Sequence, residues 1–295
     1  MRGLLSLLVS ALALTFAGMA GAQEIDWKKV DAALGKTGAV QGSVHRYGLP
    51  RSDLRVTVDG VAIKPALALG GWVAFAPAHG GAMLMGDVVL TETEIEPVMT
   101  KLLQGGVEIT ALHNHLLRAD PPTYYMHVGG HGDPVKMAGA IRAALALSKT
   151  PFEAAAASPP AAPSVDLPTA QLDLIMGVKG QANGGVYQFG VPRKDPITEG
   201  GMAVAGAMGS ANAINFQPTG GGKAAITGDF VVAGEEVNPL IRTLRENGIE
   251  VTAIHSHMLT EQPRVFFVHF WANDDAIKLA KGLRAALEKT AIAKS

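Results

Sequence analysis

The stretch GVEITALHNHLL, residues 106–117, returns 142 positions later as GIEVTAIHSHML, residues 248–259. The match continues in both directions at the same offset. YGLPRSD at residues 47–53 aligns with FGVPRKD at residues 189–195, and RAAL at residues 142–145 aligns with RAAL at residues 284–287. Self-similarity over about the length of a domain predicts two homologous units in one chain.

The repeat also sets the expected domain boundaries. We expect the first unit over residues 24–149 and the second over residues 167–291. Residues 150–166, TPFEAAAASPPAAPSVD, are rich in Ala, Pro and Ser and poor in large apolar residues, which is typical of a linker.

Residues 1–22 have the composition of a cleaved signal peptide. A basic Arg2 precedes a short apolar run, and the small residues Ala20 and Ala22 follow it. This pattern predicts a periplasmic or secreted protein. The chain contains no cysteine, so it has neither disulfides nor a cysteine that could carry a lipid anchor.

The composition limits the classes of protein to consider. A chain of 295 residues with 48% hydrophobic residues can bury a substantial core. The net charge is -1, and no stretch interleaves basic and aromatic residues, so a nucleic-acid partner is not expected. No later apolar run approaches twenty residues, so we expect no membrane span.

Hydrophobic periodicity predicts strand, helix, strand, strand and helix in each unit. In the first unit these are residues 86–90, the capped amphipathic stretch 91–106, residues 107–117, residues 123–130, and residues 133–150, where Asp133 and Pro134 mark a helix start. The fold class is therefore α+β: two tandem homologous units, each a mainly antiparallel sheet with two helices. The glycine-rich front half of each unit gives no clear order of elements.

Two histidines in each repeat lie one residue apart in a predicted strand. Residues two apart share a face of a strand, so His113 and His115 point the same way. A hairpin centred near Asp120 would place His127 directly opposite His113, on that face. The second unit carries the matching triplet His255, His257 and His269.

Three converging imidazoles suit a divalent metal, most typically zinc with three protein nitrogens and one open position. Glu108 and Glu250 fall on the opposite strand face and are excluded as ligands, whereas Asp87 or Asp229 is the nearest candidate carboxylate. The competing interpretation is a network of histidines that satisfy one another or backbone carbonyls. The sequence leaves open whether the triplets form two sites or one composite site.

Three arginines are further candidates. Arg51 and Arg193 occupy matching positions and are candidate ligand-binding residues, although Asp53 and Asp195, two residues later, are the commoner kind of partner. Arg264 lies near the predicted turn of the second unit and is the candidate catalytic residue.

The strings GVEITALHNHLL with PPTYYMHV, and GIEVTAIHSHML with QPRVFFVHFWA, together with FGVPR, resemble the LppY/LpqO family of exported bacterial proteins with a duplicated domain of unknown function. The resemblance covers most of the chain after residue 22 and implies export and a tandem architecture, but no established activity. Members of that family look like lipoproteins, and this chain departs from them because it lacks a cysteine.

Taken together, the sequence predicts an exported soluble protein that binds a divalent metal ion or a small molecule. A metal ion could support hydrolytic chemistry, with its bound water attacking a substrate that Arg264 positions. The alternative is a ligand-binding or scaffold protein with structural histidine networks. A cupin barrel, which also uses His-x-His, is the alternative fold, and the two helices per unit argue against it.

Overall fold

The computed structural model describes residues 24–152 and 165–293. The predicted signal peptide, residues 1–22, lies outside the described residues, as do residues 153–164 of the predicted linker. Among the described residues, no helix is long and apolar enough to cross a membrane.

Each unit is built on a six-stranded sheet in which neighbouring strands run antiparallel. In spatial order, the first sheet contains β1 (Ala39–Gln41), β2 (Val44–Pro50), β5 (Gly70–Ala78), β6 (Gly81–Leu90), β9 (Tyr124–Gly132) and β7 (Glu108–His113). The second contains β10 (Gln181–Asn183), β11 (Val186–Pro192), β14 (Ala211–Gly220), β15 (Lys223–Ala233), β17 (Val265–Asp275) and β16 (Glu250–His255). The two sheets therefore have the same topology.

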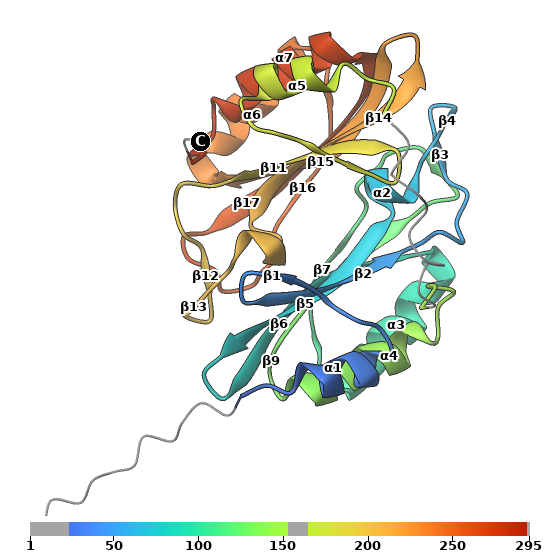
Figure 1. The fold of residues 1–295 in the computed structure, drawn as a ribbon, viewed down its shortest axis with the longest axis vertical. Coiled ribbons are helices and arrows are strands. Elements are labelled where there is room, and N and C mark those ends of the chain that lie inside the picture. Colours follow the sequence, from blue (N-terminus) through green and yellow to red (C-terminus); the bar gives the residue numbers. More distant parts are fainter. Residues whose placement is uncertain (1–23, 153–164, 294–295) are drawn as a thin grey trace, which may run out of the picture.

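Helices cover the outer face of each sheet (Figure 1). They are α1 (Trp27–Leu34), α3 (Glu92–Gln104) and α4 (Pro134–Leu145) in the first unit, and α5 (Thr169–Met176), α6 (Gly234–Glu246) and α7 (Ala276–Leu287) in the second. Each set packs its apolar side against its own sheet and forms a separate core. The predicted α+β class and duplication are confirmed, and the outer face of each sheet carries one helix more than expected, α1 or α5, ahead of the first strand.

The helix starts follow local sequence chemistry. Asp133 accepts hydrogen bonds from the backbone N–H groups of Val135 and Lys136, and Pro134 fills the first helical position, where no backbone donor is needed. The backbone N–H of Thr91 donates to the Glu94 carboxylate at 2.9 Å at the start of α3. These caps fix where the chain leaves β9 and β6.

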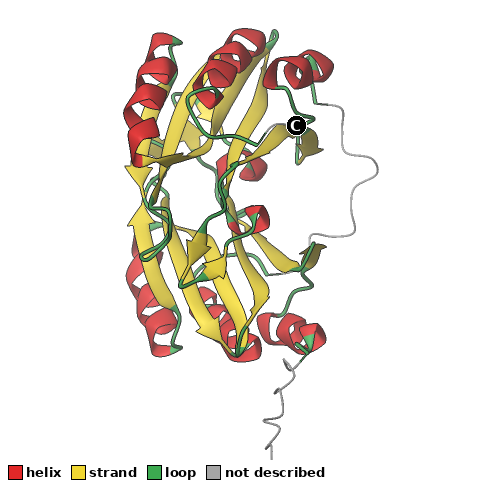
Figure 2. Ribbon diagram, turned by 90° about the vertical axis from the view of Figure 1, so that its left-hand side faces the viewer, coloured by secondary structure: helices red, strands yellow, loops and turns green. Residues whose placement is uncertain are grey.

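The inner faces of the two sheets pack against each other, which gives four layers: helices, sheet, sheet and helices (Figure 2). Residues of both units share the inner clusters, for example Met83 and Met85 with Val231 and Phe267. A sheet with two apolar faces needs cover on both sides, and here each sheet covers the other. The space between the sheets is therefore an interior of the molecule that both units build.

Short elements join the two units around this interior. α2 (Pro65–Ala68) of the first unit contacts β14 and β15, and the 3-10 turn η1 (Gly206–Met208) of the second unit contacts β2 and β5. The remaining short strands are β3 (Thr57–Val58), β4 (Val61–Ala62), β8 (Ala119–Asp120), β12 (Thr198–Glu199) and β13 (Met202–Ala203). Each unit thus lays a short helical turn on the sheet of the other.

Candidate metal centre

The register of β7 and β9 puts the histidines of the first unit on the inner face. Ala111 lies opposite His127, and His113 lies opposite Tyr125. The prediction that His113 directly opposes His127 is wrong by two residues, because the connection from β7 to β9 is not a symmetric hairpin: it includes β8, which pairs with β3. The face is nevertheless the predicted one, since Ala111 and His113 are two residues apart.

A β-bulge in each edge strand ties the two units together beside the histidines. The register shifts between Ile109 and Ala111, and between Val251 and Ala253, so Thr110 and Thr252 have no opposing residue. Thr110 Oγ1 donates to the backbone carbonyl of His257, and Thr252 Oγ1 donates to that of His115, each at 2.6 Å. Each hydrogen bond thereby holds the second histidine of one unit's His-x-His pair to the other unit.

The six predicted histidines come together in one group between the sheets, which we call the histidine cluster: His113, His115, His127, His255, His257 and His269. The closest pairs all join different units. Ring centroids are 3.4 Å apart for His113 and His255, and 3.7 Å apart both for His115 with His269 and for His127 with His257. The two triplets therefore form one composite cluster rather than two separate groups.

Two sets of four histidines have ring nitrogens within 4.8 Å of one another. One set consists of His113, His115, His255 and His269, and the other consists of His113, His127, His255 and His257. Both sets draw two residues from each unit. His113 and His255 belong to both sets and so occupy the middle of the cluster.

The Nε2 atoms of all six rings are buried and have no hydrogen-bond partner in the part of the chain that the structure describes. Several Nδ1 atoms do have one: His113 Nδ1 lies 3.1 Å from the carbonyl of Tyr125, and His269 Nδ1 lies 2.9 Å from that of Gly228. A carbonyl only accepts hydrogen bonds, so Nδ1 carries the proton there and Nε2 of a neutral ring keeps a free lone pair. This is how metal-binding histidines are commonly oriented.

Burial keeps these rings neutral. It lowers the pKa of His113 to about 4 and that of His255 to about 3. For the other four histidines, burial and then the repulsion of neighbouring imidazolium charges hold the pKa well below the usual value. Only the neutral imidazole binds a metal ion, so the cluster is in the ligand form near neutral pH.

Two carboxylates, that of the buried Asp87 and that of the partly buried Asp229, flank the cluster at equivalent positions. Asp87 Oδ2 lies 3.9 Å from Nε2 of both His115 and His127, and Asp229 forms the matching group with His257 and His269. Burial raises the pKa of Asp87 to about 8, with a further contribution from Asp229, and raises that of Asp229 to about 7.

The prediction that Glu108 and Glu250 fall on the opposite strand face is wrong, because the bulges at Thr110 and Thr252 shift the register: Glu108 lies opposite Gly129 and Glu250 opposite Trp271, on the inner face. Glu250 pairs there with Arg118 at 2.6 Å.

Arg46, on β2, is a charged residue near the cluster that the sequence did not single out. Its guanidinium stacks over Trp72 at 3.8 Å from the ring centroid, and its Nη1 donates to the carbonyl of Ala207 at 2.6 Å. Burial lowers the pKa of Arg46 to about 10, against the opposing attraction of Asp87 and Asp229. No sequence signal marks it, because Gln188 stands at the matching position of the second unit.

The structure assigns Arg51 and Arg193 to the outer cores rather than to a ligand. Arg51 is fully buried, and all five of its N–H donors are used by Asp53, Glu94 and the carbonyl of Val89. Arg193 Nη1 donates to the carbonyl of Val231 and to Glu236 at 2.6 Å. Both guanidinium groups thus bind groups of the protein itself, and Arg51 has no donor left for a ligand.

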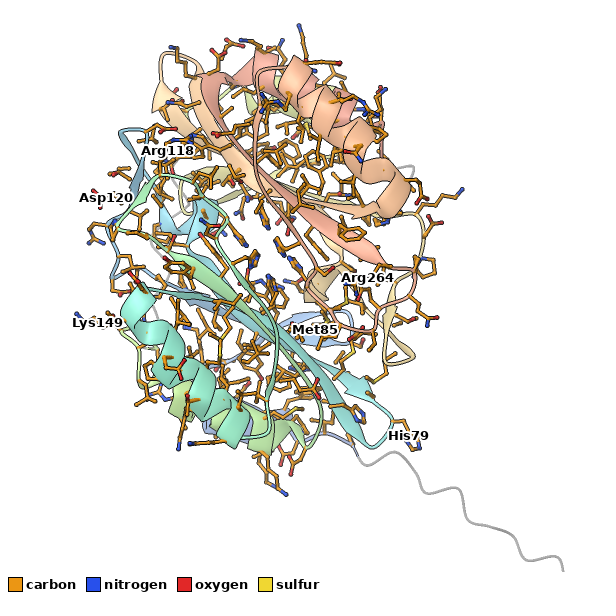
Figure 3. The ribbon with its side chains drawn as sticks, turned by 180° about the vertical axis from the view of Figure 1, so that it is seen from behind. His79, Met85, Arg118, Asp120, Lys149 and Arg264 are labelled. Carbon is orange, nitrogen blue, oxygen red and sulfur yellow. The ribbon has the colours of Figure 1, made fainter. Side chains whose placement is uncertain are left out.

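Arg264 is not brought to the histidine cluster. Its side chain is 53% exposed and pairs with Glu261 at 3.1 Å, and it extends over Phe266 (Figure 3). A catalytic role there has no contact to support it. His79 and His131 are exposed and take no part in the cluster.

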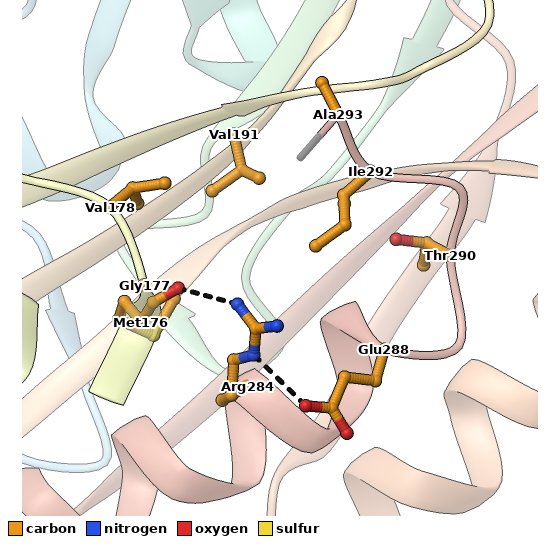
Figure 4. A pocket seen from close by; sticks show the side chains of 9 residues that line it. All are labelled: Met176, Gly177, Val178, Val191, Arg284, Glu288, Thr290, Ile292 and Ala293. Atoms are coloured by element: carbon orange, nitrogen blue, oxygen red, sulfur yellow. Dashed lines mark hydrogen bonds and ion pairs between the residues drawn. The ribbon is translucent and has the colours of Figure 1, made fainter. Parts of the chain in front are cut away.

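A cleft of about 320 Å³ opens on the opposite side of the second sheet, between α5, α7 and the last residues described (Figure 4). It contains none of the histidines. Its two charged residues, Arg284 and Glu288, pair with each other, and Arg284 also donates to the carbonyl of Met176. The chemistry-bearing residues are therefore in the histidine cluster and not in this cleft.

Comparison with known proteins gives a family but no activity. No curated protein matches the chain. Among solved structures, a trimeric bacterial microcompartment shell protein, PduB, is matched at 15% identity over 86% of this chain and 89% of that chain, with a TM-score of 0.21. The family described as Domain of Unknown Function (DUF1259) matches twice, over residues 28–147 and 170–289, one match for each unit. The chain belongs to the DUF1259 family and contains two copies of its domain.

Proposed function

We propose that this protein binds a divalent transition-metal ion, with zinc as the first candidate, in the histidine cluster between its two units. The observation that carries the proposal is the convergence of six buried Nε2 atoms that have no hydrogen-bond partner. Buried polar atoms are normally satisfied, and six exceptions at one place call for a ligand that accepts lone pairs. Imidazole is a common ligand of zinc, copper, nickel and iron.

The alternative, a network of structural histidines, is less well supported. Rings in such a network would donate to one another, yet no hydrogen bond joins two members of the cluster. A tetrahedral zinc ion, with Zn–N bonds of about 2.0–2.1 Å, keeps its nitrogens about 3.4 Å apart. Either set of four nitrogens lies within 4.8 Å and would need only a modest contraction.

Binding is favoured over hydrolysis as the role of the metal. Hydrolysis needs an open coordination position for water, and four histidine nitrogens fill a tetrahedral zinc ion. The predicted substrate-positioning residue, Arg264, pairs with Glu261 instead. We include export to the periplasm or the medium in this proposal, on the pattern of residues 1–22, and a likeness to the LppY/LpqO proteins within the duplicated-domain class.

Metal analysis of protein purified without a histidine tag tests the proposal. After dialysis against micromolar zinc and then against buffer, we expect about one ion per chain, because sites of preformed histidines bind tightly. The variant His113→Ala/His255→Ala removes a ligand pair from both sets and should lose the ion. The control His79→Gln/His131→Gln removes two exposed histidines and should keep it.

The outcomes are distinct. Less than about 0.2 ion per chain in the wild-type protein, against the tight binding expected of such sites, contradicts metal binding and favours the structural network. Equal loss of metal in both double variants would place the ion outside the cluster. Circular dichroism of each variant checks that the fold is intact.

A further inference from the structure

Arg46 has an unused pair of hydrogen-bond donors close to the histidine cluster. Within residues 24–152 and 165–293, its Nη1 alone has a protein acceptor, the carbonyl of Ala207. Its Nε and Nη2 have no acceptor among the described residues, and they are not sealed from solvent as the histidine Nε2 atoms are. The guanidinium is nevertheless fixed, because Trp72 lies 3.8 Å below it.

The same edge of two other arginines holds carboxylates in this chain. Arg51 donates from Nε and Nη2 to the two oxygens of Asp53, and Arg118 does so to Asp59. This side-on pairing is the usual geometry for an arginine and an oxyanion. On Arg46 that edge carries no carboxylate of the described residues.

Strand register places Arg46 on the face that carries the cluster. Across the sheet, Trp72 lies opposite Asp87, and Asp87 lies opposite His127, so these three side chains share the inner face. Arg46 joins that face through its stacking on Trp72. It attracts both Asp87 and Asp229, yet it forms no ion pair with either within 4 Å.

The charges around the cluster do not balance once a divalent ion is present. Asp87 and Asp229 together with Arg46 carry one negative charge when all are ionised, and the histidines are neutral. A divalent ion therefore leaves one uncompensated positive charge in the interior, and protonation of either carboxylate only increases it. Uncompensated charge away from water is costly, so a small anion would favour metal binding.

We propose that the histidine cluster binds its metal ion together with a small oxyanion, a carboxylate or a phosphate, which the Nε–Nη2 edge of Arg46 holds. This inference rests on the proposed function. It assigns a specificity role to a residue that only the first unit has, since Gln188 cannot offer a charged two-nitrogen edge. The metal and the anion then stabilise each other's binding.

The test measures zinc affinity by competition with a chromogenic chelator, with free zinc clamped by a metal buffer. Sodium chloride, acetate and phosphate are compared at equal ionic strength. Zinc should bind about tenfold more tightly in acetate or in phosphate than in chloride, within the range usual for coupled ligands. An effect of acetate alone indicates a carboxylate partner, and an effect of phosphate alone indicates a phosphate partner.

Two substitutions locate the anion. Arg46→Gln introduces the residue found in the second unit and should abolish the enhancement, while Arg55→Gln removes an exposed arginine of the same unit and should retain it. If Arg46→Gln does not fold, Arg46→Lys keeps the charge without the two-nitrogen edge and should lose most of the acetate effect.

The proposal is overturned if zinc binds equally well in all three salts, or if the enhancement survives in the folded Arg46 variants. Either result leaves metal binding itself intact. Failure to bind zinc in any salt would instead refute the proposed function.

Discussion

The two units agree on the inner face and differ around it. Both contribute the His-x-His pair, the later histidine, the flanking aspartate and the threonine at the bulge, at matching positions. They differ at two aligned positions: Arg46 of the first unit corresponds to Gln188 of the second, and Pro122 corresponds to Arg264. The matched residues are the ones that need both units to complete a group, whereas the unmatched ones lie beside that group or at the surface.

This difference teaches why the duplication is useful. A single unit presents three Nε2 atoms and one carboxylate on a sheet face with many apolar residues that has to be covered. Packing two such faces together covers both and brings the metal-ligating atoms of both units into one group. A residue that differs between the units, such as Arg46, can then make the surroundings of the cluster unequal without changing the histidines themselves.

Acidification tests whether the two triplets behave as one buried group and should have the largest effect. The pKa of each histidine of the cluster is lower in the folded protein than in the unfolded chain, so below about pH 6.5 the unfolded chain binds more protons at these residues. Asp87 and Asp229, whose pKa values are raised, act in the opposite direction but are fewer. The metal-free protein should lose stability as the pH falls from 6.5 to 4, in one transition.

Urea unfolding of metal-free protein at pH 7, 6 and 5 measures this effect. His79→Gln/His131→Gln should leave the dependence unchanged, because those two rings are exposed. A free energy of unfolding that stays constant or increases toward pH 5 contradicts the buried neutral state of the cluster.

The outer cores should respond unequally to loss of their matched arginines. Arg51→Ala leaves Glu94 buried without its partner and should cost about 3–5 kcal/mol. Arg193→Ala should cost less, because Arg193 Nε already has no partner and Asp195 is 3.7 Å away and half exposed. Urea denaturation gives both values, and Arg55→Ala, at an exposed site, should change the free energy by no more than about 0.5 kcal/mol. Equal costs for Arg51 and Arg193 would show that their networks are equivalent.

Central and peripheral histidines should differ in their effect on metal affinity. His113→Ala damages both sets of four, so zinc affinity should fall by more than about 100-fold, beyond the loss usual for residues that only orient a ligand. His115→Ala leaves the set with His127 and His257 whole and should cost less than about 10-fold. Chelator competition compares the two. A larger loss of affinity in His115→Ala than in His113→Ala would indicate that the ion binds in the set that contains His115, toward one end of the cluster.

Strand parity predicted the face of His113, His127, His255 and His269, and this part of the candidate site was accessible from sequence. The predicted strand 107–117 ends earlier, at His113, so His115 and the matching His257 lie just beyond their strands. Residues two apart on a strand share a face whatever the register, so the two-residue error at His113 and His127 did not move either side chain to the other face. The helix caps at Asp133 and Glu94 were equally readable, because they depend on neighbours a few residues away.

What the sequence did not predict depends on contacts between distant segments. The pairing of His113 with His255 requires the two sheets to face each other, which periodicity within one unit does not specify. Arg46 meets Ala207 across 161 positions of the chain, and no local pattern encodes such a contact. Arg51 looked like a ligand-binding residue because Glu94, its second partner, lies 43 residues away.

The cross-unit hydrogen bonds provide the smallest and most symmetric test. Thr110→Val and Thr252→Val keep the side-chain shape but remove the hydroxyl that reaches the carbonyl of His257 or His115. Each should lower the free energy of unfolding by about 1 kcal/mol, the usual net value of one such bond. Because each bond also holds the loop that carries a histidine of the other unit, zinc affinity should fall slightly in both variants. Equal losses at the two threonines would mean that the bulges stabilise the two units alike, although the units differ at Arg46, at Arg264 and in the networks of Arg51 and Arg193.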